Sequence, residues 1–390
     1  MRGDGKRVRL GDVCAVVSGS TPKTTEAKYW GGKFRWVTPA EIQDDTIFIF
    51  DTQRHITEEG IKSSHLQLLP EGTVLLSSRA PIGKVAIAGK EMYCNQGFKN
   101  LICSDKIRNK YLYYYLKNKR EYLHSLGRGA TFKEISLRIV ENLELYLPSL
   151  GEQDIVIKKL DLITMLIDCF HRQRESFDEI VKSRFIEMFG DPETNPQRWQ
   201  ETKLKSLILK GNNGLSRRGC DSNGDIVLRL VELQKNFIDY SQPNRITLSP
   251  EEKERYALQD HDFLFARVNG NPDNVGRGAE FSALSEPVYF NDHIIRVHFR
   301  DDLLDSCFFG YLVNSDYGRK KLRAQIKTSA GQYTISQQGI SEFPLYLPPL
   351  NLQKSFRHMV ERIDKSKLAI QKSIDELEIL KKKLMQEYFG

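Results

Sequence analysis

The sequence has 390 residues, of which 40% are hydrophobic and 28% are charged. A chain of this length is too long for one ordinary hydrophobic core and suits two or three globular domains. No apolar run approaches the roughly 18 residues that a membrane span needs, and residues 1–6 do not begin a signal peptide, so we expect neither a membrane protein nor a secreted one. The six cysteines are scattered without paired spacing, which favours a reducing cytoplasm over a disulfide framework or a zinc site.

The formal net charge of +7 is unevenly distributed. Residues 1–150 contain 23 Lys and Arg against 16 Asp and Glu, whereas the remaining residues contain 35 of each. A positive surplus in one part of a chain favours a polyanionic partner such as nucleic acid, although the surplus alone does not identify one.

Residues 1–147 are predicted to form a first mixed domain of short strands, polar turns and helix. In chain order we expect a strand at Phe34–Val37, a buried strand at Thr73–Ser77, a strand at Val85–Ala88, a helix at Lys110–Tyr122, a basic glycine loop at Gly127–Thr131 and a strand at Leu143–Leu147.

Residues 148–190 are predicted to form one long helix. Pro148 precedes it and Gly190 ends it, as turn-forming residues often do. Its apolar residues alternate at spacings of three and four with occasional gaps, which is the pattern of a helix that buries a narrow stripe. The stripe contains Leu160, Ile163, Ile167, Phe170, Phe177 and Val181.

Residues 191–347 repeat the outline of the first domain with little identity, and residues 348–390 repeat the long helix. The buried strand before Arg267 is expected to match the one before Arg79, and Gly276-Arg277 to match Gly83-Lys84. A second helix is expected at Phe308–Leu322. The stripe of the second long helix contains Val360, Ile363, Ile370, Ile374, Leu377 and Leu384.

The two long helices are equal in length, because the offset is 200 residues both at Gln153 and Gln353 and at Gly190 and Gly390. Equal stripes favour packing of the two helices on each other, although each could instead pack on its neighbouring domain. Only a short loop follows the first helix, so a parallel pair would require the chain to return along a rod of about 50 Å. We therefore predict an α+β fold in which two domains are separated by an antiparallel coiled coil, with a pseudo-two-fold duplication.

Catalytic motifs are missing from the sequence. It has no Gly-x-x-x-x-Gly-Lys-Ser/Thr phosphate loop, no Asn/Asp-Pro-Pro-aromatic tetrad of amino-methylating enzymes and no His-x-x-x-His pair. The glycines around Arg128 neither follow a strand nor open a helix, which argues against a dinucleotide site. We expect no catalytic residue and no metal site on this chain.

The polar loops instead contain residue types that contact phosphates and base edges. Most polar residues in loops are only solvated, but Arg79 and Arg267 stand out because each follows a buried strand. In the first domain the candidates for DNA binding are Ser20, Thr21, Lys23, Arg79, Lys84, Asn95, Gln96, Lys99, Arg128 and Lys133. In the second domain they are Arg217, Arg218, Arg267, Asn269, Asn271, Arg277, Lys327, Gln332 and Tyr333.

Several short motifs are spread along the chain. They are Gly19-Ser20-Thr21-Pro22, Tyr29-Trp30-Gly31, Trp36-Val37, Gly72-Thr73-Val74-Leu75 with Arg79, Ile82-Gly83, Asn95-Gln96-Gly97 and the two Leu-Pro-x-Leu-x-x-Gln segments at 147–153 and 347–353. In these motifs and in its duplicated arrangement, the whole chain resembles the DNA-specificity subunit of type I restriction–modification enzymes. The second domain lacks the Gly-Ser-Thr-Pro loop and the Asn-Gln-Gly turn of the first, so the resemblance carries fewer contacts over to it.

The resemblance implies a non-catalytic subunit in which each domain reads one half of a bipartite double-stranded DNA site. It implies that the long helices set the spacer and that their exposed faces, in residues 151–190 and 351–390, dock two methyltransferase subunits. S-adenosylmethionine, ATP and Mg²⁺ would then bind to partner subunits, S-adenosylmethionine to the methyltransferases and ATP to the translocating endonuclease. The alternatives are a free-standing DNA-binding regulator, a divergent DNA methyltransferase or nuclease, and a coiled-coil scaffold that binds protein.

Overall fold

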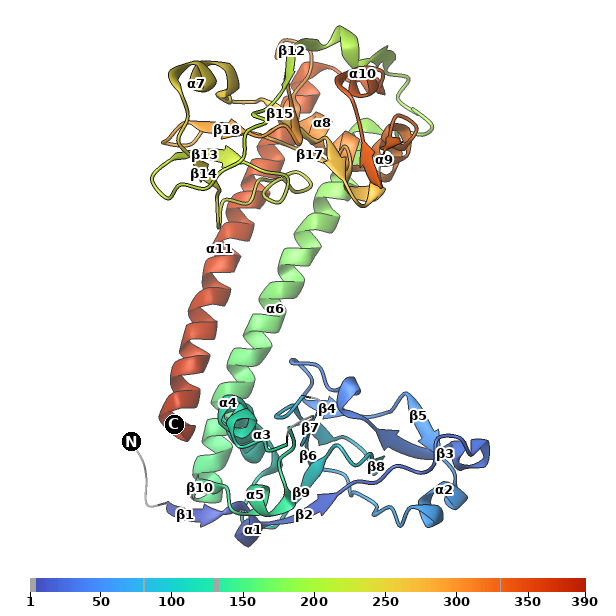
Figure 1. The fold of residues 1–390 in the computed structure, drawn as a ribbon, viewed down its shortest axis with the longest axis vertical. Helices are drawn as coiled ribbons and strands as arrows, with labels where there is room; N and C mark the ends of the chain where they lie inside the picture. Colours follow the sequence, from blue (N-terminus) through green and yellow to red (C-terminus); the bar gives the residue numbers. More distant parts are fainter. Residues whose placement is uncertain (1–4, 80, 130–132, 330) are drawn as a thin grey trace. The chain divides into compact units, whose positions relative to one another are not determined.

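The computed structural model describes residues 5–79, 81–129, 133–329 and 331–390 (Figure 1). It divides into two compact units, of which unit 1 contains Met1–Arg172 and Gln371–Gly390, and unit 2 contains Gln173–Ile370. Each unit therefore combines one domain with a segment of each long helix. Ala130 and Thr131 of the predicted glycine loop lie outside the described residues.

The domain of unit 1 is built on a mixed five-stranded sheet of order β2-β9-β6-β7-β4. A three-stranded sheet of order β5-β3-β8 and a pair of β1 with β10 accompany it. Its elements are β1 (Lys6–Arg9), α1 (Leu10–Val13), β2 (Cys14–Ser18), η1 (Ala27–Tyr29), β3 (Trp30–Val37), η2 (Pro39–Glu41), β4 (Phe48–Ile49), β5 (Arg54–Ile56), α2 (Glu58–Ser63), β6 (Val74–Leu76), β7 (Val85–Ala88), β8 (Tyr93–Cys94), β9 (Lys99–Cys103), α3 (Asn109–Asn118), α4 (Arg120–Ser125), α5 (Leu137–Glu141) and β10 (Glu144–Leu147).

The core of unit 1 lies between its five-stranded sheet and α3. Val74 and Leu76 of β6 are fully buried in the same cluster as Tyr111 and Leu112 of α3. The tyrosines of α3 keep their hydroxyls satisfied; for example, the Tyr115 hydroxyl donates to the Glu144 carbonyl at 2.7 Å. Bulky amphipathic side chains can therefore fill this core without stranding a polar group.

The domain of unit 2 has a four-stranded sheet of order β12-β19-β15-β17, two three-stranded sheets of order β14-β13-β18 and β16-β21-β20, and a pair of β11 with β22. Its elements are β11 (Gln200–Lys203), η3 (Leu204–Ser206), β12 (Ile208–Asn213), β13 (Asp225–Leu228), β14 (Arg245–Ile246), α7 (Pro250–Tyr256), β15 (Phe263–Ala266), β16 (Val268–Asn269), η4 (Pro272–Asn274), β17 (Gly278–Glu280), β18 (Val288–Phe290), β19 (Ile294–Phe299), α8 (Ser306–Asn314), α9 (Asp316–Arg323), β20 (Lys327–Ser329), β21 (Gln332–Thr334), α10 (Gln337–Ser341) and β22 (Pro344–Leu347).

The duplication is visible in how each domain closes. In unit 1 the first strand pairs antiparallel with the strand before the long helix, Lys6 opposite Leu147. In unit 2 β11 pairs with β22 in the same way, Gln200 opposite Leu347. Two predicted helices are each interrupted: Lys119 separates α3 from α4, and Ser315, whose side chain caps α9, separates α8 from α9.

The long helices are α6 (Leu150–Phe189) and α11 (Leu350–Phe389). In unit 1 the start of α6 meets the end of α11, since Lys159 Nζ lies 3.1 Å from the Tyr388 hydroxyl. In unit 2 the end of α6 meets the start of α11, since the rings of Phe185 and Phe356 are 5.4 Å apart. The helices therefore run in opposite directions, which confirms the predicted antiparallel pair and the α+β class.

The residues of the two predicted stripes are all buried or half-buried. Leu160, Ile163, Ile167, Val181, Val360, Ile370 and Ile374 are buried, and Phe170, Phe177, Ile363, Leu377 and Leu384 are half-buried.

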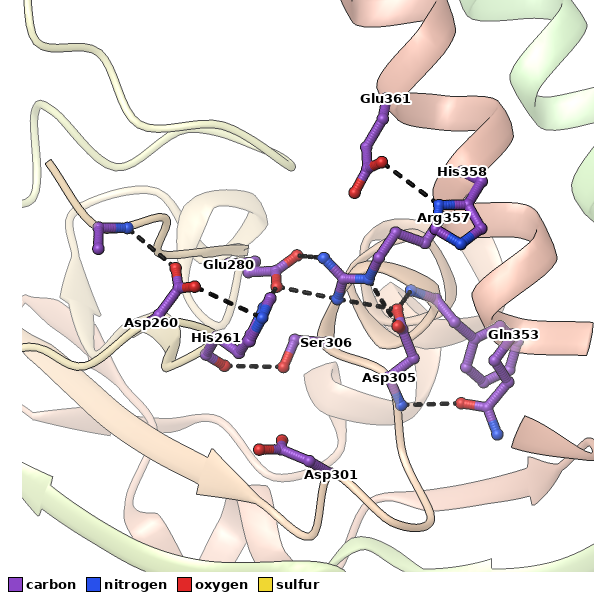
Figure 2. A network of polar contacts seen from close by, with 12 residues as sticks. Asp260, His261, Glu280, Asp301, Asp305, Ser306, Gln353, Arg357, His358 and Glu361 are labelled. Carbon is purple, nitrogen blue, oxygen red and sulfur yellow. Dashed lines mark hydrogen bonds and ion pairs between the residues drawn. The ribbon is translucent and has the colours of Figure 1, made fainter. Parts of the chain in front are cut away.

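An ion-pair network fixes α11 to the domain of unit 2 (Figure 2). The Arg357 guanidinium reaches from the helix to Asp305, with Nε 2.6 Å from Oδ2, and to Glu280, with Nη2 2.9 Å from Oε1. Burial opposes the charged form of Arg357, but the two carboxylates outweigh it and raise its pKa. His261 continues the network, with Nδ1 2.5 Å from Glu280 Oε1.

Candidate nucleic-acid interface

In unit 1 the loop after β2 lies directly against the turn after β8. The Ser20 N–H donates to the Cys94 carbonyl at 3.1 Å. A Cβ on Gly19 would lie 2.0 Å from the Asn95 carbonyl oxygen, so this close approach requires glycine. The turn is held by its own side chain, because Asn95 Oδ1 accepts from the Gly97 N–H at 2.9 Å. We call residues 95–97 the asparagine turn of unit 1.

The other side of the asparagine turn meets the end of the buried strand β6. The Ser78 N–H donates to the Gly97 carbonyl at 2.7 Å, and the Ser78 carbonyl accepts from the Ile135 N–H at 3.1 Å. Next to Ile135, Glu134 pairs with Arg128 through two backbone hydrogen bonds of 3.0 Å. Segments far apart in the sequence thus converge at one place.

The carboxylate of Glu134 contacts two cations beside the asparagine turn of unit 1. Glu134 accepts from Lys99 Nζ at 3.0 Å and lies 3.5 Å from Arg79 Nη1. The Lys99 side chain is 10% exposed, whereas that of Arg79 is 34% exposed. Lys99 therefore balances Glu134 inside the domain, and Arg79 keeps part of its guanidinium towards solvent.

The predicted residues of the first domain fall into two groups. Those brought together at the asparagine turn are Ser20, Thr21, Arg79, Asn95, Gln96, Lys99 and Arg128, with the exposed Lys133 beside Glu134. The Lys84 ammonium is instead engaged within the domain, because its Nζ donates to the carbonyls of Ile42 at 2.7 Å and Pro39 at 3.2 Å. Lys23 is exposed, and its carbonyl accepts from Trp30 Nε1 at 3.3 Å.

Unit 2 repeats this framework with different side chains. The Leu215 N–H donates to the Phe290 carbonyl at 2.9 Å, as Ser20 does to Cys94. A Cβ on Gly214 would lie 2.2 Å from the same carbonyl, which makes Gly214 the counterpart of Gly19. Asn291 Oδ1 accepts from the His293 N–H at 3.1 Å, so residues 291–293 form the asparagine turn of unit 2.

The backbone hydrogen bonds correct the expected match between Arg79 and Arg267. The Arg267 N–H donates to the His293 carbonyl at 2.8 Å, and the Arg267 carbonyl accepts from the Ile335 N–H at 2.9 Å. These are the bonds that Ser78 makes in unit 1, so Arg267 corresponds to Ser78 and not to Arg79. The residues before them, Ser77 and Ala266, also match, because the Ser77 carbonyl accepts from the Gly83 N–H at 3.0 Å and the Ala266 carbonyl from the Gly276 N–H at 2.7 Å. The strands therefore align without the gap that the expected match of Arg79 with Arg267 requires.

The expected match of Lys84 with Arg277 is confirmed by the same kind of bonds. The Lys84 carbonyl accepts from the Ser77 N–H at 2.9 Å, and the Arg277 carbonyl accepts from the Ala266 N–H at 2.8 Å. Arg277 Nη2 donates to the Leu230 carbonyl at 3.2 Å, and burial lowers its pKa. Both cations therefore hold protein carbonyls.

The remaining candidates of the second domain lie on three segments. Arg217 forms a bidentate pair with Glu252 at 2.8 and 3.2 Å, and Asn271 Oδ1 accepts from the Asp273 N–H at 2.9 Å. Asn269 pairs with Tyr333 between β16 and β21, and the exposed Gln332 begins β21. Lys327 pairs with Thr334 as Arg128 pairs with Glu134, which puts a cation at the same hairpin position in both units. Arg218 reaches the asparagine turn, with Nη2 2.7 Å from Asp292 Oδ1.

A family model described as the type I restriction modification DNA specificity domain matches residues 3–175 and 196–379. The chain belongs to this family. The two matched stretches correspond to the two copies of the framework, each with part of a long helix.

Relatives of this specificity family include two restriction enzyme specificity subunits. The chain is 37% identical to the MjaIX subunit of Methanocaldococcus jannaschii over 208 residues, which is 52% of this chain and 48% of that one. It is 30% identical to the StySPI subunit of Salmonella potsdam over 339 residues, which is 82% of this chain and 72% of that one.

Solved structures of the specificity family share the fold. The S subunit from M. genitalium has a TM-score of 0.61 and 14% identity, over 99% of this chain and 96% of that one. A chain from a structure on complex assembly and conformational transition of the type I R-M system has a TM-score of 0.64 and 16% identity, over 100% of this chain and 98% of that one.

The sequence did not predict the asparagine turn of unit 2 as a part of the DNA-binding site. Its three residues, Asn291, Asp292 and His293, are not among the predicted DNA-binding residues. Only the first of them is identical to its counterpart in the Asn-Gln-Gly turn of unit 1, so the motif is not recognisable in the sequence of the second domain. The available signal was an asparagine directly after a buried strand, β18, in the position that Asn95 has after β8.

The chemistry of this interface is that of hydrogen bonding and charge. Burial raises the pKa of the Cys94 thiol beneath the turn to about 12, so it is not an activated nucleophile. Within residues 5–79, 81–129, 133–329 and 331–390, no three His, Cys, Asp or Glu side chains are grouped to hold a metal ion. In that same part of the chain, no helix is long and apolar enough to cross a membrane.

Proposed function

We propose that the chain is the non-catalytic DNA sequence-recognition subunit of a type I restriction–modification complex. In this proposal each domain reads one half of a bipartite double-stranded DNA site, and α6 and α11 set the unread spacer. The observation that carries it is one backbone framework present twice with different polar side chains. Such an arrangement keeps the mode of docking constant while the bases that are read can differ.

The partners in this proposal are two methyltransferase subunits and the translocating endonuclease subunits, in the cytoplasm. S-adenosylmethionine, ATP and Mg²⁺ bind to those partner subunits and not to this chain. Support comes from large apolar side chains that are exposed on both helices, because a protein partner that covered them would remove apolar surface from water. They are Ile155, Leu162, Met165, Leu166, Ile180 and Ile186 on α6, and Leu368, Ile379 and Leu380 on α11.

The test is selection of binding sites from a pool of random duplexes, by the full chain alone and by the chain co-purified with the modification methyltransferase of its own cell. The proposal predicts co-purification and two short conserved half-sites at a fixed separation. Binding as a single site without a methyltransferase would instead favour a free-standing regulator. Tight binding of S-adenosylmethionine by the chain alone would favour a divergent methyltransferase.

A further inference from the structure

We propose that the middle residue of each asparagine turn, Gln96 in unit 1 and Asp292 in unit 2, determines a base preference in its half-site. Gln96 would read a base edge as a hydrogen-bond donor, and Asp292 would read one as an acceptor. This inference rests on the proposed function, since it names the specificity residues of that same interface.

The two residues occupy the same place in the framework. The Asn95 N–H donates to the Val37 carbonyl at 3.1 Å, and the Asn291 N–H donates to the Leu228 carbonyl at 2.9 Å. Each turn then closes through its asparagine side chain on the residue two positions later. The residue between them is at the tip of the turn, so its side chain can differ without disturbing the backbone.

The loop after β2 or β12 supplies a partner to each middle residue. In unit 1 the Thr21 hydroxyl donates to Gln96 Oε1. In unit 2 Arg218, which lies four residues after Gly214 as Lys23 lies after Gly19, brings Nη2 to 2.7 Å from Asp292 Oδ1. The same two segments are therefore joined by side chains in both units, through a hydrogen bond in unit 1 and an ion pair in unit 2.

The polarity of the two middle residues is opposite. An amide whose oxygen is engaged by a hydroxyl offers its NH₂ hydrogens, which suit the N7 and O6 of guanine or the O4 of thymine. A carboxylate can only accept, which suits the N4 amino group of cytosine or the N6 amino group of adenine. Arg267 helps to hold the asparagine turn of unit 2 in place, since its Nη1 donates to the backbone carbonyl of Asp292 at 3.0 Å.

Exposure agrees with this role. Gln96 is exposed, and Asp292 is half-buried beside the exposed Arg218. Because Arg218 neutralises one carboxylate oxygen, Asp292 can approach the negatively charged duplex without the repulsion that an isolated carboxylate would meet.

The test uses isosteric substitutions in the full chain with its methyltransferase, and reads the base preference at every position of the site by selection from random duplexes. Gln96→Glu removes the donors without changing shape. We expect discrimination at one base pair of the first half-site to change by about tenfold or more, towards cytosine or adenine, with the second half-site unchanged. The matched control is Gln67→Glu, at an exposed glutamine outside the turn, which should leave both half-sites unchanged.

Asp292→Asn should alter one base pair of the second half-site and leave the first unchanged. If either turn substitution lowered affinity for all duplexes by the same factor, or changed nothing, the turns would not read bases and the inference would be overturned. If the unmodified chain selected no bipartite site, the proposed function would fail as well. The two failures are therefore distinguishable.

Discussion

Gln153 and Gln353 make the same set of hydrogen bonds, 200 residues apart. Both are fully buried near the start of a long helix. The Gln153 oxygen accepts from the backbone N–H of Arg108 at 2.8 Å, and the Gln353 oxygen accepts from that of Asp305 at 2.9 Å. Arg108 and Asp305 are the N-cap residues of α3 and α8, so each glutamine ties a long helix to a helix of its own domain.

The nitrogen of each glutamine completes the tie. It donates to one carbonyl in the loop before the capped helix and to the carbonyl of the proline before the long helix. These carbonyls belong to Lys106 (3.1 Å) and Pro148 (3.0 Å) for Gln153, and to Leu303 (3.1 Å) and Pro348 (2.8 Å) for Gln353.

Gln153→Leu should destabilise unit 1 and leave unit 2 unchanged. The substitution keeps the volume but strands a buried N–H and two carbonyls, each of which costs about 1–3 kcal/mol when unsatisfied. Hydrogen exchange should quicken at residues 106–112 and at the start of α6, and stay unchanged at residues 303–309. Gln353→Leu should quicken hydrogen exchange at residues 303–309 and at the start of α11, and leave residues 106–112 unchanged. The control Gln338→Leu, at an exposed position, should change exchange in neither segment.

Arg357→Met should lower the free energy of unfolding of unit 2 by about 3 kcal/mol. The Arg357 side chain is only 16% exposed, and its removal leaves the carboxylates of Asp305 and Glu280 without their cation in a buried site (Figure 2). Denaturant titration measures the loss, which Arg357→Lys should partly avoid. A variant as stable as the parent protein would show that the network contributes nothing.

Lys84 and Arg128 should behave differently towards DNA. Lys84→Met breaks two bonds to carbonyls of its own domain, so it should lower stability and leave the salt dependence of DNA binding unchanged. Arg128→Ala removes an exposed cation beside the asparagine turn, so it should weaken binding to all sequences and reduce the slope of log K against log salt by about one. A reduced slope for Lys84→Met with full stability would reverse this assignment.

Asp364→Asn should stabilise unit 2 at about pH 7 and have little effect at about pH 3. Burial raises the pKa of Asp364, Lys367 lowers it and Asp178 raises it further, so that the net shift is upward. Because the Asp364 side chain is 60% exposed, solvent screens these interactions and the gain in stability should be small. Below the unfolded pKa both states are protonated and there is no penalty. As pH rises through the unfolded and then the folded pKa, ionisation costs the folded state more, and stability falls. Thermal unfolding at both pH values measures the difference, and equal shifts of Tm would contradict it.

The duplicated helices could be predicted from the sequence because a heptad stripe and its flanking prolines are local signals. Their opposite directions followed from the short loop after Gly190. The break at Ser315 has a sequence signal, because serine is a preferred residue at the start of a helix. In the structure its side chain accepts from the Gly318 N–H at 3.2 Å, as a helix cap does. The break was missed because the apolar pattern continues across it.

The interface was only partly predictable because its contacts are long-range. Nothing local to Lys84 shows that its Nζ meets the carbonyls of Pro39 and Ile42. Arg267 resembled Arg79 because both follow a buried strand, and only the hydrogen bonds to the asparagine turn and to Ile335 revealed the shift by one residue.

The central claim is that two domains read separate half-sites while the paired helices set the distance between them. Removing one heptad from the middle of α6 and one from the middle of α11 tests it most directly, because the stripes stay in register. Selection of binding sites should then return the same two half-sites with a shorter spacer. Altered half-site sequences, or an unchanged spacer in a folded variant, would contradict the claim.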